Sequence, residues 1–317
     1  MKHLITKYKI VLVFVLTILL VWIIRIYLPS KKSNADITNE FWIRKTHVFS
    51  KKNIVAAGNS RVYRGISIKA LQNGIAQNIN GVNLGYSALG YSYDYLEYVE
   101  SRVDKSSKCK ILLFGVEPGN FTKIAAENKS FKQYKDVRET EVFKTLYINP
   151  YFNLPTFSPT EIIDLLVSPK SNNGFIEIRK NYFGKYYEDG WVASYKIPGN
   201  PDEALPIYKK FWSKNDSNLD IELIEQFFQK LYELSMQGIT IVGFRPPSTE
   251  GMQKWENEQF KFNEDYFKSR FEKIGGIWID VNTSQYNSYD GAHLHYESAE
   301  KLSFYLGEKI KAFCYPE

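Results

Sequence analysis

The sequence is poor in cysteine, and this scarcity excludes two classes of protein. It has 317 residues but only two cysteines, too few for a disulfide framework or for a zinc cage built from cysteines. Cys109 precedes the apolar run KILLFGV, and Cys314 ends the last helical segment. In an alternating α/β fold these two positions fall on the same side of the sheet. Two alternatives stay open: one structural disulfide, as occurs outside the cell, or two unpaired thiols.

The globular part also lacks a surplus of positive charge. The formal net charge is +6, but residues 1 to 35 contain six of the 41 Lys and Arg residues and no acid. The rest of the chain therefore has 35 basic residues against 35 acidic ones. A protein that binds nucleic acid through its phosphates needs an excess of cations on the folded domain. We therefore expect no nucleic-acid partner.

One long apolar run is present, at the N-terminus. Residues 10–24 are apolar apart from one threonine, and the run extends to residue 28 if the long side chain of Arg25 reaches the membrane surface. At about 1.5 Å per residue, such a helix nearly spans a bilayer core of about 30 Å. A cleaved signal peptide and a buried core helix are the alternatives. The length of the run and the charges of Lys31 and Lys32 favour an uncleaved anchor.

This anchor sets the expected order of the chain. We expect a cytoplasmic tail over 1–9, a transmembrane anchor over 10–28, a linker over 29–50 and a domain over 51–317. The three lysines and the amino terminus before the apolar run slightly outnumber the basic residues after it, which favours a cytoplasmic N-terminus. The pattern predicts a single-pass protein of the inner (plasma) membrane whose domain lies outside the cytoplasm.

The rest of the chain alternates between strand-like and helical segments. Strands are expected at 53–58, 79–85, 110–118, 239–247 and 277–281, and helices are expected between them and after them. The clearest helix covers 219–236, where apolar residues recur at helical spacing up to Gly238. Strands that are apolar on both faces and separated by amphipathic helices predict an α/β fold with a mostly parallel five-stranded sheet.

Residues 119–205 break this alternation. The stretch is rich in Asn, Lys, Tyr and Phe, as in KNYFGKYYEDGW at 180–191. We interpret it as an insertion, or lid, between strands 3 and 4. Its aromatic side chains could stack on sugars or form a small core of their own.

A serine follows the first strand. In a parallel sheet, ligands gather at the carboxyl ends of the strands, and Ser60 leaves the first strand at that edge, near the start of a helix. A serine there can be a nucleophile if a base lies beside it. It can also be only the N-cap of the helix.

The histidines favour the nucleophile. Of the four in the chain, His3 and His47 lie near the expected anchor and linker, which leaves His293 and His295 in YDGAHLHYESAEKL, after the fifth strand. Asp290 precedes His293 by three residues, a spacing that lets a carboxylate hold one ring nitrogen while the other faces a serine. We therefore predict a catalytic row of Ser60, His293 and Asp290. The HLH sequence alone is a poor metal site, so we expect no metal and no cofactor.

These segments resemble the SGNH/GDSL hydrolase family. GNSR (58–61) is similar to the family's first block, NLG (83–85) to its second and DGAHL (290–294) to its fifth. The resemblance implies a three-layer flavodoxin-like SGNH fold with Ser60 as nucleophile. It makes Asp290 and His293 the acid and base, and it makes the amides of Ser60 and Gly85 donors of an oxyanion hole.

The sequence departs from the family's pattern at two positions. Asn59 stands where the family usually has aspartate, and Glu117 stands where the third block usually has the asparagine that donates to the oxyanion. Either Asn120 takes over that donation or two backbone amides suffice. Losing one such donor costs about 100-fold to 1000-fold in rate.

Further features are similar to extracytoplasmic members of the family that modify cell-surface glycans. They are SRVYRG (60–65), FRPPS (244–248), the anchor and the insertion. The resemblance implies an O-acyltransferase that moves an acyl group, acetyl in the first place, through an acyl-serine onto a cell-surface polysaccharide beside a membrane-bound O-acyltransferase. Arg245 and Arg61 are then candidates for substrate binding. A carbohydrate esterase or deacetylase of the same fold, and a non-catalytic scaffold, are the alternatives.

Overall fold

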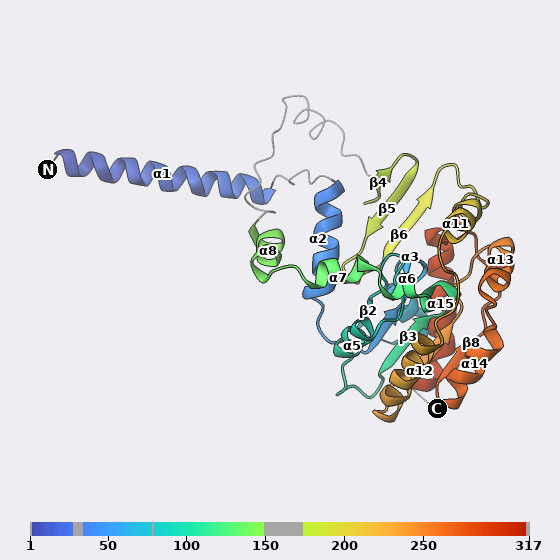
Figure 1. Ribbon diagram of the computed structural model, residues 1–317. Coiled ribbons are helices and arrows are strands. Elements are labelled where there is room, and N and C mark those ends of the chain that lie inside the picture. The colour runs from blue at the N-terminus through green and yellow to red at the C-terminus, as the bar shows by residue number, and fades with distance from the viewer. Residues whose placement is uncertain (1, 28–33, 78, 149–173, 315–317) are drawn as a thin grey trace. The chain divides into compact units, whose positions relative to one another are not determined.

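The computed structural model describes residues 2–27, 34–77, 79–148 and 174–314 (Figure 1). The chain divides into two compact units. One contains the described residues before Arg44 and those from 137 to 148, and the other contains Arg44–Asp136 and the described residues from 174 onward. The elements of the first unit are α1 (Lys2–Tyr27), most of α2 (Asn34–His47), α8 (Glu139–Phe143) and the π-helical η2 (Lys144–Ile148).

The membrane anchor expected over 10–28 is not supported. Helix α1 forms over most of this stretch, but no helix in the described part of the chain combines the length and hydrophobicity needed to cross a membrane. The residues between Lys9 and Arg25 number 15, and as a helix they cover only about 22 Å of a bilayer core of about 30 Å. Residues 28–33 lie outside the described residues, and α2 occupies residues 34–47 of the expected linker.

The second unit is built on five strands that are all parallel. In the order of the sheet they are β2 (Gly81–Asn83), β1 (Ile54–Ala57), β3 (Ile111–Gly115), β7 (Thr240–Phe244) and β8 (Ile277–Ile279). This confirms the α/β fold and the parallel five-stranded sheet. By position in the chain the order is 2-1-3-4-5, which is that of doubly wound sheets. Strands β1 and β3 are buried along their whole length, as expected for runs that are apolar on both faces.

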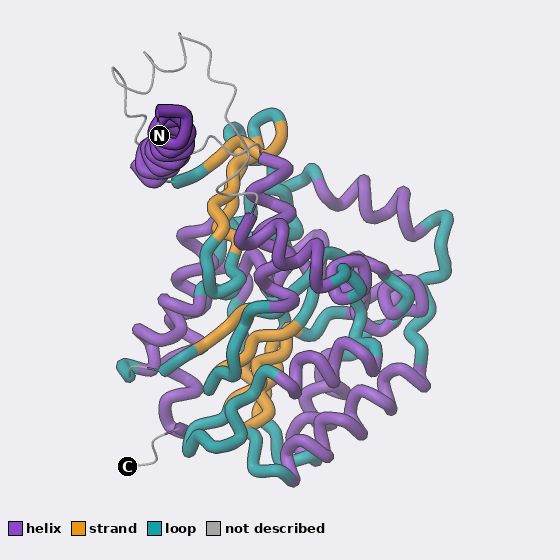
Figure 2. The backbone as a smooth tube through the Cα atoms, turned by 90° about the vertical axis from the view of Figure 1, so that its left-hand side faces the viewer, coloured by secondary structure: helices purple, strands orange, loops and turns teal. Residues whose placement is uncertain are grey.

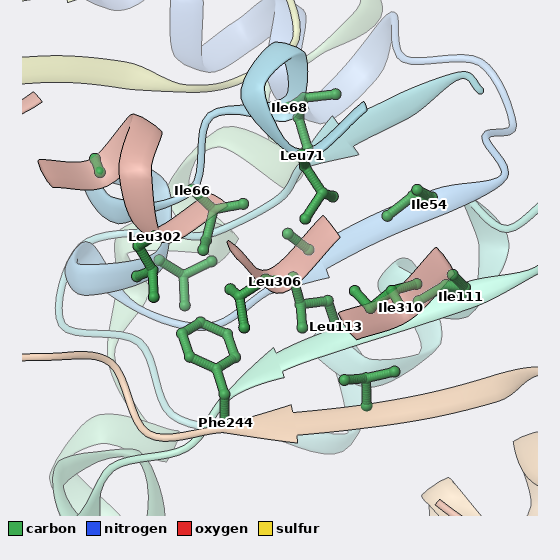
Figure 3. Close-up of a cluster of buried hydrophobic side chains, with 14 of the residues drawn as sticks. Ile54, Ile66, Ile68, Leu71, Ile111, Leu113, Phe244, Leu302, Leu306 and Ile310 are labelled. Carbon is green, nitrogen blue, oxygen red and sulfur yellow. The ribbon is translucent and has the colours of Figure 1, made fainter. Parts of the chain in front are cut away.

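Helices cover both faces of the sheet, as Figure 2 shows, so this unit has three layers. On one face Ile54, Ile111 and Leu113 share a buried cluster with side chains of α4 (Ile68–Ile75) and α15 (Tyr296–Cys314) (Figure 3). On the other face, the ring of Phe114 lies 5.5 Å from that of Phe227. The helices on that side are α5 (Tyr93–Ser101), α12 (Ile221–Met236) and α14 (Glu264–Lys273).

Two glycines let α4 and α15 cross at close range. A Cβ on Gly74 would lie 2.2 Å from the carbonyl oxygen of Phe304, and a Cβ on Gly307 would lie 2.3 Å from that of Leu71. Real side chains cannot come so near a backbone oxygen, so larger residues at either position would force the helices apart. The crossing holds α15 against the sheet directly after the loop that contains His293.

The segment between β3 and α12 contains secondary structure that the sequence did not predict. Its described elements in this unit are η1 (Pro118–Phe121), α6 (Lys123–Ala126), α7 (Lys129–Lys135), the antiparallel strands β4 (Ile176–Arg179), β5 (Tyr182–Tyr186) and β6 (Val192–Lys196), and α11 (Ala204–Trp212). Phe183 and Tyr195 pair across β5 and β6 with ring centroids 5.0 Å apart. Trp191 is 1% exposed and belongs to the main core. Part of the aromatic content of the insertion therefore serves packing.

Candidate active site

Ser60 lies where β1 leaves the sheet and α3 (Ser60–Gly65) begins. Asn59 caps this helix, because its Oδ1 accepts a hydrogen bond from the Arg61 amide at 3.0 Å. Gly58 allows the turn: its φ of +150° favours glycine, and a Cβ there would lie 2.4 Å from Val62 Cγ2. Since Asn59 performs the capping, the Ser60 hydroxyl is left for another contact.

That contact is with His293. Ser60 Oγ lies 2.9 Å from Nε2 of His293, and the other ring nitrogen, Nδ1, lies 2.8 Å from Asp290 Oδ2. Asp290 Oδ1 accepts hydrogen bonds from the amides of Ala292 at 2.9 Å and of His293 at 2.8 Å. The structure thus brings together side chains 233 residues apart in one hydrogen-bonded row. Each of the three remains 8 to 9% exposed, so the row is not sealed from solvent.

The electrostatics of the row keep the carboxyl charged and the imidazole neutral. Burial opposes the charge on Asp290, but His293 and the two amides hold the pKa of the aspartate well below its usual range. Burial lowers the pKa of His293; Asp290 opposes this shift, and Arg64 and Arg61 add to it. Because a carboxylate can only accept, Nδ1 must carry the ring proton, which leaves Nε2 free to accept the proton of Ser60.

Two of the three predicted oxyanion donors are engaged elsewhere. The Gly85 amide donates to Asn83 Oδ1 at 3.0 Å. The side chain of Asn120 donates to the carbonyl of Leu89 at 2.9 Å and accepts from the Glu117 amide at 3.0 Å. Asn120 is fully buried, so the prediction that it replaces the missing donor is wrong. Among the described residues no hydrogen-bond acceptor faces the Ser60 amide, which leaves this donor available to an oxyanion.

Asn59 and Glu117, the two residues that depart from the pattern of the family that the sequence resembles, face each other. Asn59 Nδ2 donates to Glu117 Oε1, and Glu117 Oε2 lies 2.8 Å from Arg61 Nη1. Burial raises the pKa of Glu117, and Arg61 opposes that rise. The carboxylate is therefore held by an amide and balanced by a guanidinium. A carboxylate at position 117 needs a donor at position 59, and asparagine supplies one where aspartate could not.

Arg61 and Arg245, predicted to bind substrate, belong instead to a buried ionic network. They are 3% and 5% exposed. Glu256, on α13 (Glu250–Phe260), joins them: its carboxylate lies 2.5 Å from Arg61 Nη2 and 3.3 Å from Arg245 Nη2. Arg245 also pairs with Glu264 at 3.2 Å. Because their charges are already paired out of solvent, these two arginines have no free face for a substrate, and that prediction is wrong.

Sequence reasoning missed two residues that shape the site. Glu256 lies in a helix whose sequence carries no recognisable motif, so nothing marked it as the centre of the network. Tyr289 stands next to Asp290 in the chain, and its ring stacks on that of His293 with centroids 6.0 Å apart and planes 16° apart. Its place beside the DGAH block was a usable signal, since neighbours of a catalytic loop often pack on it.

His295 lies apart from the row. Its Nδ1 is 3.8 Å from Glu297 Oε2, and its ring packs on Tyr296 with centroids 4.6 Å apart. Across the described ranges, no group of three or more His, Cys, Asp and Glu side chains could hold a metal ion.

Comparisons with known proteins do not assign this chain to a family. No family model matches this chain. No curated protein matches it either. A solved structure from Streptococcus pneumonia, which carries a provisional assignment as a platelet activating factor, aligns over 88% of this chain and 92% of its own, at 10% identity and a TM-score of 0.35. At that TM-score the likeness supports no functional argument.

Proposed function

We propose that this protein is a serine-dependent acyl-transfer enzyme that works through an acyl-Ser60 intermediate. One observation carries the proposal: Ser60 Oγ, 2.9 Å from the Nε2 of a buried imidazole whose Nδ1 is held by Asp290 at 2.8 Å. The three residues of such a row have distinct roles: Ser60 is the nucleophile, His293 is the general base, and the carboxylate of Asp290 fixes the tautomer of that base. A helix cap needs none of this arrangement, and here the cap is a different residue.

The proposed reaction has two half-reactions. In the first, His293 takes the proton of Ser60 while Oγ forms a bond to the ester carbonyl carbon. The bond from that carbon to the leaving oxygen then breaks, and His293 returns the proton to the departing alcohol. In the second, His293 deprotonates an acceptor hydroxyl, whose oxygen attacks the acyl-Ser60 carbonyl. The bond from that carbon to Ser60 Oγ then breaks, and His293 returns the proton to Oγ. Asp290 stabilises the imidazolium in both.

The supply of oxyanion donors limits the expected rate. The Ser60 amide is available, whereas those of Gly85 and Asn120 are engaged. Each missing donor lowers kcat by about 100-fold to 1000-fold. We therefore expect slow turnover with water as acceptor.

We further propose that the acceptor is a hydroxyl of a cell-surface polysaccharide and that the transferred group is acetyl, supplied beside a membrane-bound O-acyltransferase. The similarity of the motifs to glycan-modifying SGNH proteins supports this. The proposed place of action is outside the cytoplasm. In its support, Cys109 is disulfide-bonded, which is typical of oxidising compartments.

The experiment is an acetyl-release and acetyl-transfer assay on the full chain. With 4-nitrophenyl acetate as donor and oligosaccharides as acceptors, release is followed by absorbance and transfer by the mass of the product. Ser60→Ala and His293→Ala should each lower release by about 1000-fold or more, while the exposed control Ser213→Ala should leave it unchanged. Unaltered release in Ser60→Ala would refute the proposal. Release without transfer to any oligosaccharide would make the protein an esterase.

A further inference from the structure

Arg64 lies one helical turn after Ser60 on α3, so the two side chains share a face of the helix. Its Nη1 donates a hydrogen bond to the hydroxyl of Tyr289 at 3.1 Å. Tyr289 in turn stacks on the ring of His293. The guanidinium is therefore fixed beside the catalytic row.

Aromatic rings surround this guanidinium. Its central carbon lies 5.0 Å from the ring centre of Tyr63 and 5.3 Å from that of Tyr182 on β5. The hydroxyl of Tyr289 also lies 3.3 Å from Ser194 Oγ on β6. The insertion sheet thus helps to hold Arg64 in place. The residue is half-buried, so part of it remains open to solvent.

Arg64 differs from the arginines of the ionic network in its charge balance. Arg61 and Arg245 each have carboxylate partners. Within the described ranges, by contrast, no carboxylate oxygen lies within 4.0 Å of the Arg64 guanidinium. The nearby carboxylate of Asp290 is committed to His293. Withdrawing a charge from water without a partner is costly, and three phenol rings do not neutralise it.

We propose that Arg64 binds an anionic oxygen group, a carboxylate or a phosphate, on the molecule that occupies the site. A guanidinium presents a planar fork of donors that matches such groups. Its place beside the catalytic row makes Arg64 the residue that selects a charged substrate. This inference rests on the proposed acyl-transfer function and deepens it by naming the substrate class.

The first test compares two esters that differ in one charge: 4-acetoxybenzoate and its neutral methyl ester. In the unaltered protein, kcat/KM should favour the charged ester. Arg64→Gln should lower that preference by about 10-fold to 100-fold through KM, since a charge-assisted pair is lost. Arg64→Lys should retain part of it. The control Arg270→Gln, which removes an arginine paired with Glu225 on an outer helix, should retain all of it.

An equal preference in Arg64→Gln and the unaltered protein would overturn the proposal. So would an equal change with both esters, because that would mean that Arg64 acts only on His293. If neither ester is cleaved, the proposed function fails, and a second measurement still tests Arg64. Inorganic phosphate and D-glucuronate, taken separately, should raise the Tm of the unaltered protein and of Arg270→Gln but not of Arg64→Gln. The ligand with the larger shift identifies the anion, and no shift with either overturns the proposal.

Discussion

Replacing Asn59 by aspartate would set two carboxyl groups against each other in a buried site. Asn59 and Glu117 are each 6% exposed, and the amide of one donates to the carboxylate of the other. In Asn59→Asp that donor is lost and a like charge takes its place. The helix cap should survive, because aspartate caps as well as asparagine does. The loss of stability should therefore report the pair alone.

Its size follows from two estimates. Two unit charges about 4 Å apart at an effective dielectric constant of about 20 repel by about 4 kcal/mol. Protonating one carboxyl avoids the repulsion, and from an ordinary pKa of about 4 this costs about 4 kcal/mol at pH 7. We expect Asn59→Asp to lower the free energy of unfolding by about 3 to 4 kcal/mol at pH 7. A pair that shares a proton has one folded-state pKa raised above its unfolded value. The loss should therefore be small below about pH 4 and grow as the pH rises.

The matched control is Glu117→Gln, which keeps the shape of the side chain and removes its charge. In that background Asn59→Asp restores one carboxylate and one amide with their positions exchanged, so its cost should fall to about 1 kcal/mol or less. Urea unfolding of the four proteins at pH 7 and pH 4 measures the coupling. If Asn59→Asp lowers the free energy of unfolding by the same amount in the unaltered protein and in Glu117→Gln, within about 0.5 kcal/mol, the side chains at positions 59 and 117 do not interact as described.

Three further predictions concern the base, the second strand and the disulfide. His293 must be neutral to act, and burial lowers its pKa. The midpoint of the fall of kcat/KM on the acid side should therefore lie below about pH 6.5; a midpoint above that value would contradict a buried, neutral His293. Asn83→Ala removes three buried hydrogen bonds, to the carbonyls of Val62 and Ile66 and from the Gly85 amide. It should cost about 2 to 4 kcal/mol in urea unfolding, against none for the exposed control Asn218→Ala. Reduction of the Cys109 disulfide should lower the unfolding free energy by about 2 to 4 kcal/mol; an unchanged curve would mean that the bond is absent.

The sequence predicted the sheet well, because strands that are apolar on both faces leave a clear signal. Each of the five expected runs contains a strand of the parallel sheet, although the strands are shorter than the runs. It also predicted that Ser60, Asp290 and His293 would meet, since all three follow strands at one edge of a parallel sheet. The antiparallel strands of the insertion were missed because their residues mix aromatic and polar types without a clean alternation.

The charged residues were predicted least well. An arginine in a sequence looks the same whether it is paired in the interior or open at a site. Arg61 and Arg245 were expected to bind substrate, yet Glu256 pairs with both, and Glu256 is 195 residues from Arg61 in the chain. Such pairing depends on tertiary contacts between elements far apart in sequence, which no local pattern records.

The most direct test of the acyl-serine mechanism is a covalent one. The full chain is treated with a fluorophosphonate, which reacts preferentially with an activated serine, and the adduct is located by peptide mass spectrometry. We predict one adduct, on Ser60, absent from Ser60→Ala and strongly reduced in His293→Ala. A folded protein that forms no adduct, or one whose adduct lies on another serine, would contradict the mechanism.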